Sequence, residues 1–233
     1  MQGIPPPNWD DRLLTVNTAE SIKTDAKAPW KGIEFNNKRL ESRFLFRTAL
    51  TKSILPFALY EPCLVALPVI IEKENNQKKI KLFNVDDLRK EGYLNAATWF
   101  ADVENIWKIH RTEKNGGISS IDYLNWQNKL SEQNLNQPYL VLYSASSKDA
   151  NTTVVKREDL DLEFIIDKIT YWFSTENLEE AYYLSAILNS ETPNLMMKDF
   201  QSKGLFGARD VSKKILDIYY PRYDAEADSH RRL

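Results

Sequence analysis

The chain has 233 residues, of which 42% are hydrophobic, 12% aromatic and 27% charged, and its formal net charge is −2. This near-average globular composition excludes an intrinsically disordered chain and a low-complexity repeat. One cysteine and two histidines exclude an intramolecular disulfide and argue against a Cys- or His-based metal centre. The longest apolar run, residues 64–71, contains Pro68 and is too short to span a bilayer, so we expect a cytoplasmic protein without a membrane partner.

The N-terminal third predicts an extended segment followed by irregular strands. Residues 1–45 show little hydrophobic periodicity and many turn-forming residues, so we expect a lead-in arm there and one domain over residues 46–233. Apolar runs at 55–62 and 63–71 are interrupted by prolines, which cannot donate to a strand ladder. These runs therefore predict edge strands or strands with irregular ends, and residues 80–83 are a candidate partner strand.

Further helices and strands are expected in clusters. Apolar residues recur at spacings of three and four from Trp99 to His110, which predicts a helix, and a second helix is expected from about Ser119 to Glu132. Because helices and strands do not alternate strictly, we expect an α+β fold with a mixed, mostly antiparallel sheet and packed helices. The other expected elements are strands at 139–143, 152–156, 169–173 and 215–221, a helix at 178–188 capped by Asn177, and a short helix ending at Phe200.

The usual catalytic motifs are missing from the sequence. There is no glycine-rich cofactor loop and no Asn/Asp-Pro-Pro-aromatic motif, so the chain is not expected to methylate DNA by itself or to be an enzyme. A nuclease-like acid set, Asp11 with Asp25 and Lys27, matches easily by chance in an acid-rich chain. A serine hydrolase would need His110 or His230 as its base. The first lies on an apolar helix face and the second in a C-terminal segment expected to be frayed.

Basic side chains gather in two segments of this mildly acidic chain. Residues 23–52 contain eight cations and three acids, and residues 200–214 combine four cations with two glycines. Phosphates are contacted by Lys, Arg, Ser and backbone N–H groups, and base edges are read by Arg, Gln and Asn. Both segments are therefore candidate nucleic-acid contacts, although a solvated basic loop explains the composition equally well.

Several segments together resemble a known protein family. The stretches 179–190, 200–214, 218–224 and 230–233 follow one another as in the C-terminal target-recognition (specificity) region of adenine-specific DNA methyltransferases, including fused type II restriction–modification enzymes. Upstream, residues 53–57, 67–69, 105–107, 124–130 and 139–146 are similar in order and spacing, so the resemblance covers about residues 45–233. The chain departs from the family at Ser144 and Ser147, where Asn and Gly are usual, and at Tyr219–Pro221, which replaces a Pro-Ile-Pro-like end.

The resemblance implies a sequence-specific DNA-binding domain that positions double-stranded DNA for a methyltransferase catalytic domain, supplied in cis or in trans. It implies no cofactor in this chain, S-adenosylmethionine in the parent enzyme, and a chain that is part of a longer polypeptide. The expected DNA-binding residues are Gln201, Ser202, Lys203, Arg209, Lys213 and Lys214, a second surface of Tyr143, Ser144, Ser146, Ser147, Lys148 and Asn151, and backbone contacts from Arg39, Arg43 and Arg47.

Two alternatives remain open. In one, the chain is a protein–protein docking module of a multi-subunit enzyme, its aromatic-rich helices bind a catalytic subunit, and the basic segment at 200–214 is incidental. In the other, the chain is a hydrolase that depends on His110.

Overall fold

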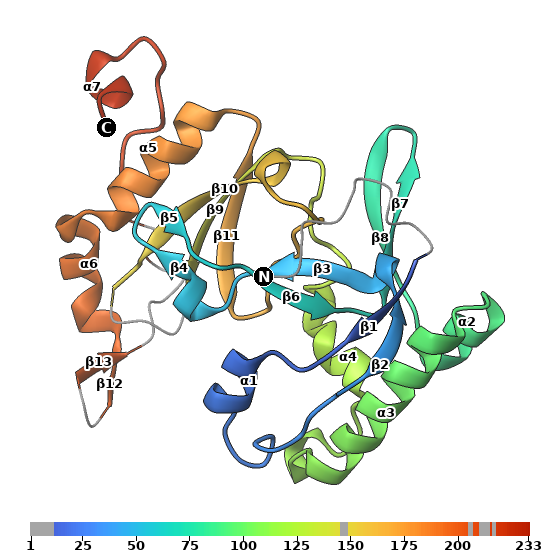
Figure 1. Cartoon of the computed structure of the whole chain (residues 1–233). Helices are drawn as coiled ribbons and strands as arrows, with labels where there is room; N and C mark the ends of the chain where they lie inside the picture. Colours follow the sequence, from blue (N-terminus) through green and yellow to red (C-terminus); the bar gives the residue numbers. More distant parts are fainter. Residues whose placement is uncertain (1–11, 145–148, 205–206, 210–214, 216–217) are drawn as a thin grey trace. The chain divides into compact units, whose positions relative to one another are not determined.

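The computed structural model describes residues 12–144, 149–204, 207–209, 215 and 218–233, and its chain divides into two units (Figure 1). Unit 1 comprises Met1–Phe46 and Ala66–Glu132, and unit 2 comprises Arg47–Val65 and Gln133–Leu233. The chain passes from unit 1 to unit 2 within β3 (Leu45–Thr48) and returns within β6 (Cys63–Ala66). Among the described residues, no helix is both long enough and apolar enough to cross a membrane.

Unit 1 is built from two small antiparallel ladders and a long helix. Strand β1 (Leu13–Val16) pairs with β2 (Lys38–Glu41), and the hairpin β7–β8 joins Val69–Glu74 to Gln77–Leu82. Helix α3 (Leu94–His110) lies against β2 (Figure 1). The remaining helical elements of unit 1 are α1 (Glu20–Asp25), α2 (Val85–Lys90), α4 (Ser120–Leu124) and the short 3-10 turns Ser42–Phe44, Glu113–Asn115 and Trp126–Asn128.

The start of helix α3 is stabilised by a residue from a distant strand. Tyr93 at the N-cap position gives no side-chain hydrogen bond, but Glu41 of β2 accepts the backbone N–H groups of Asn95 (3.1 Å) and Ala96 (2.8 Å). The first N–H groups of a helix have no partner within the helix, and its N-terminus favours negative charge. The Glu41 carboxylate therefore fixes β2 to α3 inside unit 1.

Residues 12–46 do not form a separate arm. They contribute β1, α1 and β2 to unit 1, so the division of the chain differs from the expected boundary near residue 46. The pairing of residues 13–16 with 38–41 and the contact of β2 with α3 are long-range interactions. The hydrophobic periodicity of residues 12–46 does not predict these long-range interactions.

Unit 2 contains a three-stranded antiparallel sheet in the order β10–β9–β11, with helix α5 against β9 and β10 (Figure 1). Val141 and Tyr143 of β9 contact the core shared with α5, while Leu140 and Leu142 belong to a second core on the opposite face. Successive side chains of a strand point to opposite faces of the sheet. Because both faces of β9 are buried, apolar residues occupy all four positions. The three strands are β9 (Tyr139–Ser144), β10 (Thr152–Lys156) and β11 (Thr170–Thr175).

The other elements of unit 2 are short. They are β4 (Ile54–Leu55), β5 (Ala58–Leu59), α5 (Leu178–Asn189), α6 (Glu191–Met197), β12 (Ser202–Gly204), β13 (Gly207–Arg209), α7 (Asp228–Arg231) and the 3-10 turns Thr51–Ser53, Arg157–Asp159 and Lys198–Phe200.

The expected α+β class is confirmed, with antiparallel pairing in the β1–β2, β4–β5, β7–β8, β9–β10, β9–β11 and β12–β13 ladders, but the strands form several small sheets. The helix at 178–188 and its cap are confirmed, because the Asn177 side chain accepts N–H groups of Glu179 and Glu180. The helix expected to reach Glu132 ends at Leu124, and Gln127 and Asn128 have positive φ angles that interrupt it. The strand expected at 215–221 is wrong for the described residues there, since none of them is in a strand.

Arg47 and Asp161 form a two-point ion pair within unit 2. The Arg47 Nε and Nη2 atoms each donate to a carboxylate oxygen of Asp161 at 2.8 Å, and Nη1 donates to the Pro62 carbonyl at 3.1 Å. The backbones around both residues are also connected, because Arg47 N–H donates to Glu163 O and Ile165 N–H donates to Arg47 O. The hydrogen bonds from Arg47 lower the pKa of Asp161 despite its partial burial.

We predict that Asp161→Asn lowers the free energy of unfolding by about 2 kcal/mol at neutral pH, because it removes charge-assisted hydrogen bonds. A carboxylate whose folded pKa is depressed contributes stability that is present above its unfolded pKa of about 4 and lost as pH falls through the folded pKa. The difference between the wild type and this variant should therefore shrink between about pH 7 and about pH 3 in urea unfolding measurements.

The matched control for Asp161→Asn is Asp86→Asn, which breaks the exposed pair between Asp86 and Arg89. Exposed pairs of this kind contribute less than about 0.5 kcal/mol, so this variant should match the wild type. An Asp161→Asn effect of constant size across the pH range would contradict the role assigned to the ion pair.

Candidate nucleic-acid interface

The mid-chain candidate segment joins β9 to β10 in unit 2. Tyr143 and Ser144 end β9, and Asn151 directly precedes β10. The Tyr143 ring is 2% exposed and packs against Tyr171 at a centroid distance of 5.1 Å, so it is part of the core rather than of the surface expected from the sequence. Ser146, Ser147 and Lys148 lie outside the described residues.

The second candidate segment follows helix α6. Gln201 is buried, Ser202 and Lys203 lie on β12, and Arg209 lies on β13. The two strands pair antiparallel, with Ser202 opposite Arg209. The basic residues Lys203 and Arg209 thus lie on a two-stranded antiparallel ladder. Lys213 and Lys214 lie outside the described residues.

The three candidate arginines at 39–47 divide between the two units. Arg39 is exposed on β2 of unit 1. Arg43, also in unit 1, donates to the Tyr93 hydroxyl and lies 5.2 Å from the centre of that ring. Arg47 belongs to unit 2 and its guanidinium contacts Asp161 and Pro62. Two of the three guanidinium groups therefore already have partners within the fold.

Two asparagines near the junction of α5 and α6 hold the end of the mid-chain segment. Asn189 accepts the backbone N–H of Thr152 through Oδ1 and donates to its carbonyl through Nδ2, both at 2.8 Å. Asn194 accepts the N–H of Ala150 at 2.8 Å and donates to the carbonyls of Leu188 and Ser190. Both carboxamides satisfy backbone groups, which explains why amide side chains stand at these positions.

A pocket of about 350 Å³ lies beside this junction, and we call it the polar pocket. Asn151 and Lys198 are among the residues that border it, and neither side chain forms a hydrogen bond or ion pair with the described residues. An amide offers both a donor and an acceptor, and an ammonium offers donors and charge. The residues that define the polar pocket include Pro56, Asp149, Asn151, Ser190, Asn194 and Lys198.

The polar pocket is bordered by the mid-chain segment and by the chain just before the second candidate segment of unit 2. Asp149, Ala150 and Asn151 come from the mid-chain segment, and Lys198 stands three residues before Gln201. No sequence pattern singled out Asn194 or Lys198, and residues 188–190 stood out only as part of the family resemblance. The sequence signal that could have identified this junction is the Asn189 amide, because a polar residue directly after an apolar helix face often bonds backbone groups.

The two histidines do not assemble a hydrolase site with the described residues. His110 contacts the edge of the Trp30 ring at a centroid distance of 5.7 Å. His230 is not frayed as expected, because its ring packs on Tyr183 at 4.6 Å and its Nδ1 accepts the Asp224 N–H. Within the described ranges, no group of three or more His, Cys, Asp or Glu side chains is placed to hold a metal ion.

Comparison with known proteins leaves the family open: no protein-family model and no curated protein sequence matches the chain.

We predict that Asn189→Ala lowers the free energy of unfolding by about 2 kcal/mol, because the fully buried Thr152 loses its N–H partner. The Thr152 carbonyl keeps the Phe57 N–H as a donor, so the N–H group should account for most of the loss. Amide hydrogen exchange should be faster at Thr152, while urea unfolding reports the loss of stability.

Ser190→Ala is the neighbouring control, because its exposed hydroxyl bonds only the Ile187 carbonyl. This substitution should cost less than about 1 kcal/mol and leave the Thr152 exchange rate unchanged. Equal exchange at Thr152 in the wild type and in Asn189→Ala would refute the anchoring role of Asn189.

Proposed function

We propose that the chain is the target-recognition domain of an adenine-specific DNA methyltransferase of a restriction–modification system. In this proposal, unit 2 binds double-stranded DNA, and a catalytic domain outside this chain carries out methyl transfer. The support comes from the residues that resemble such domains between about 45 and 233 and from the arrangement of unit 2 around the polar pocket.

The observation that carries the proposal is the convergence of two segments at the polar pocket. The mid-chain segment contributes Asn151, and the turn leading to Gln201 and β12 contributes Lys198. The mid-chain segment and residues 200–214 were candidates from the sequence, and Lys198 lies just before the second of them. DNA recognition requires groups that hold phosphates and groups that read base edges on one surface, and a lysine beside an amide supplies one of each.

Rigid placement of the contact groups is the second support. The mid-chain segment is fixed at its C-terminal end by Asn189 and Asn194, so Asn151 lies between two anchored backbone groups, at Ala150 and Thr152. A residue whose backbone is held on both sides loses less backbone freedom on binding than one on an unrestrained loop. This arrangement suits a group that must distinguish one base from another.

A protein-docking role is favoured by a different observation. Leu195, Met196 and Phe200 of α6 and the turn after it are 48%, 53% and 62% exposed. Exposed apolar side chains that lie together mark many protein interfaces. In a docking module, Met196→Ser would abolish binding to a catalytic subunit, whereas removal of the nearby positive charges would leave that binding unchanged.

We predict salt-sensitive binding of the full chain to a random-sequence duplex of about 30 base pairs, measured by fluorescence anisotropy between about 50 and 200 mM salt. Each phosphate contact contributes about 0.9 to the slope of log K against log salt. Lys198→Ala and Lys203→Ala should each reduce that slope by about this amount. Asn151→Ala should leave the slope unchanged and weaken discrimination between duplex sequences, because an amide reads bases without neutralising charge.

The control is Lys73→Ala, which removes a lysine from the exposed β7–β8 hairpin of unit 1. Lys73→Ala changes the net charge by the same amount as Lys198→Ala and should leave the slope of log K against log salt unchanged. Undetectable binding at the lowest salt, or an equal loss of slope in Lys73→Ala and Lys198→Ala, would overturn the proposal.

A further inference from the structure

A second pocket lies in unit 1, in a part of the molecule that the proposed DNA contacts of unit 2 do not use. Its volume is about 460 Å³, within the range of about 300–1,000 Å³ that is usual for small-molecule sites. We call it the aromatic pocket, and the residues that line it include Trp30, Phe35, Val103, Ile106, Trp107 and Tyr123.

The walls of the aromatic pocket are fixed by contacts within unit 1. Trp107 is 8% exposed and donates its ring N–H to the Ile118 carbonyl at 2.8 Å, which sets the orientation of the ring. The Tyr123 ring packs against Trp107 at a centroid distance of 4.5 Å. The Trp30 ring stacks on Trp107 at a centroid distance of 5.8 Å, with an interplanar angle of 10°. These contacts fix the three rings relative to one another, so the aromatic lining of the pocket is preformed.

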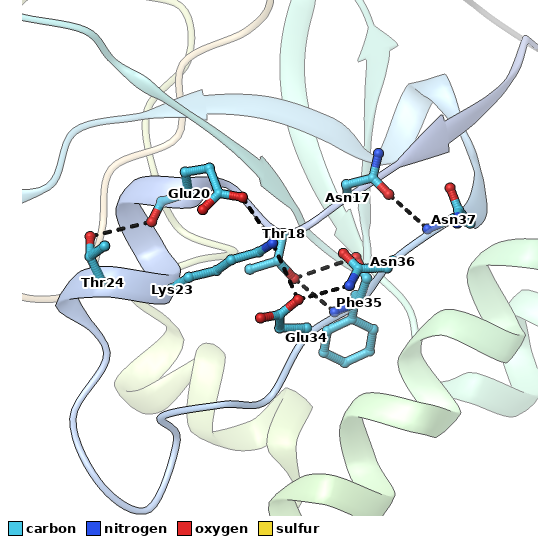
Figure 2. A network of polar contacts seen from close by, with 9 residues as sticks. All are labelled: Asn17, Thr18, Glu20, Lys23, Thr24, Glu34, Phe35, Asn36 and Asn37. Atoms are coloured by element: carbon cyan, nitrogen blue, oxygen red, sulfur yellow. Dashed lines mark hydrogen bonds and ion pairs between the residues drawn. The ribbon is translucent and has the colours of Figure 1, made fainter.

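Residues 17–37 join β1 to β2, include α1 and contribute several residues to the pocket lining, and the two ends of this segment are hydrogen-bonded to each other (Figure 2). Thr18 accepts the Phe35 N–H at 2.7 Å through Oγ1, and its own N–H donates to the Phe35 carbonyl at 2.8 Å. Asn17 accepts the Asn37 N–H at 2.8 Å. Within this segment, Gly32 has a φ of +87°, a conformation that favours glycine. The bonds at the two ends of this segment thus extend the pairing of the β1–β2 ladder, whose last pair is Val16 and Lys38.

The polar part of the pocket centres on Glu34. Its Oε2 atom accepts from Asn36 Nδ2 at 2.8 Å and lies 3.2 Å from Lys23 Nζ, which also contacts Glu20 (Figure 2). These hydrogen bonds lower the pKa of Glu34 and raise that of Lys23, so both are charged at neutral pH. The other carboxylate oxygen, Oε1, accepts no hydrogen bond from the residues that the structure describes, and no dashed line reaches it in Figure 2.

We propose that the aromatic pocket binds a small, planar, nitrogen-containing aromatic molecule whose N–H group donates to Glu34 Oε1. The ring system of the ligand packs against Trp30 and Trp107, which supply dispersion and ring-stacking contacts. A carboxylate oxygen at the edge of an apolar pocket selects for a donor, because a ligand without one would cover the oxygen and leave it without a partner.

A ligand with a neutral N–H donor fits the charged residues around the aromatic pocket better than a cationic ligand does. The pocket is bordered by Glu34 and by two lysines, Lys23 and Lys31, and Lys23 is already shared by Glu20 and Glu34. A second positive charge beside Lys23 would be repelled at short range. A neutral heteroaromatic ring with one N–H therefore matches both the flat apolar walls and the available acceptor.

The test is isothermal titration calorimetry of the full chain with indole and with 1-methylindole, which has nearly the same shape but no N–H donor. Indole should bind at one site with a Kd on the order of 0.1–1 mM, as expected for a ligand of its size, and 1-methylindole should bind about tenfold more weakly. Glu34→Ala should weaken indole binding by about tenfold and change 1-methylindole binding by less than about twofold.

Glu20→Gln is the matched control, because Glu20 contacts the same lysine but does not border the pocket. It should bind both ligands as the wild type does. Val103→Trp fills the pocket from α3 and should abolish binding of both ligands; a melting temperature equal to that of the wild type would show that this variant folds.

Several results would overturn the proposal. They are no heat of binding with indole at about 5 mM, equal affinity for indole and 1-methylindole, or an unchanged indole affinity in Glu34→Ala. A capped pentapeptide with a central tryptophan tests whether the natural ligand is a free small molecule or a tryptophan side chain of another protein, because both present an indole ring. Weak or no binding of the peptide supports a free small molecule, and binding as tight as that of indole would assign the pocket to a protein side chain instead. None of these measurements depends on DNA binding, so this proposal and the proposed function fail independently.

Discussion

Thr152 is fully buried at the start of β10, and its backbone N–H must find a partner inside the protein. Asn189 supplies that partner from the end of α5, and its amide also donates to the Thr152 carbonyl, which receives the Phe57 N–H as well. A buried, unsatisfied backbone group costs about 1–3 kcal/mol, so position 189 requires a side chain that accepts the Thr152 N–H, and the amide adds a second donor to the carbonyl. The sheet, helix α5 and the mid-chain segment all depend on this junction.

Long-range polar contacts have the same role in unit 1. Glu41 caps α3 from β2, and Thr18 and Phe35 bond the two ends of the segment that joins β1 to β2 beside the aromatic pocket. The β1–β2 and β7–β8 ladders of this unit have two strands each, and two-stranded ladders are marginally stable alone in water. Packing against helices and hydrogen bonds between distant residues must therefore stabilise them.

The two proposals concern different units and different chemistry. In unit 2, an amide and an ammonium border a polar pocket, which suits bases and phosphates. In unit 1, aromatic residues and the Glu34 carboxylate line one pocket, which suits a small heteroaromatic donor. The Asn151 amide and Glu34 Oε1 both lack a hydrogen-bond partner among the described residues, and so does the Lys198 ammonium.

The sequence by itself determined the features that depend on neighbours along the chain. These include the α+β class, the strand at 139–143, the helix at 178–188 and its Asn177 cap, because periodicity and capping act over a few residues. Tertiary structure alone decided that residues 12–46 join unit 1, that Tyr143 is buried, that Asn189 anchors Thr152, and that Trp30 stacks on the distant Trp107. Those outcomes require long loops to close. The entropy lost on closure is offset by packing and hydrogen bonding between distant residues, and no local pattern in the sequence encodes that balance.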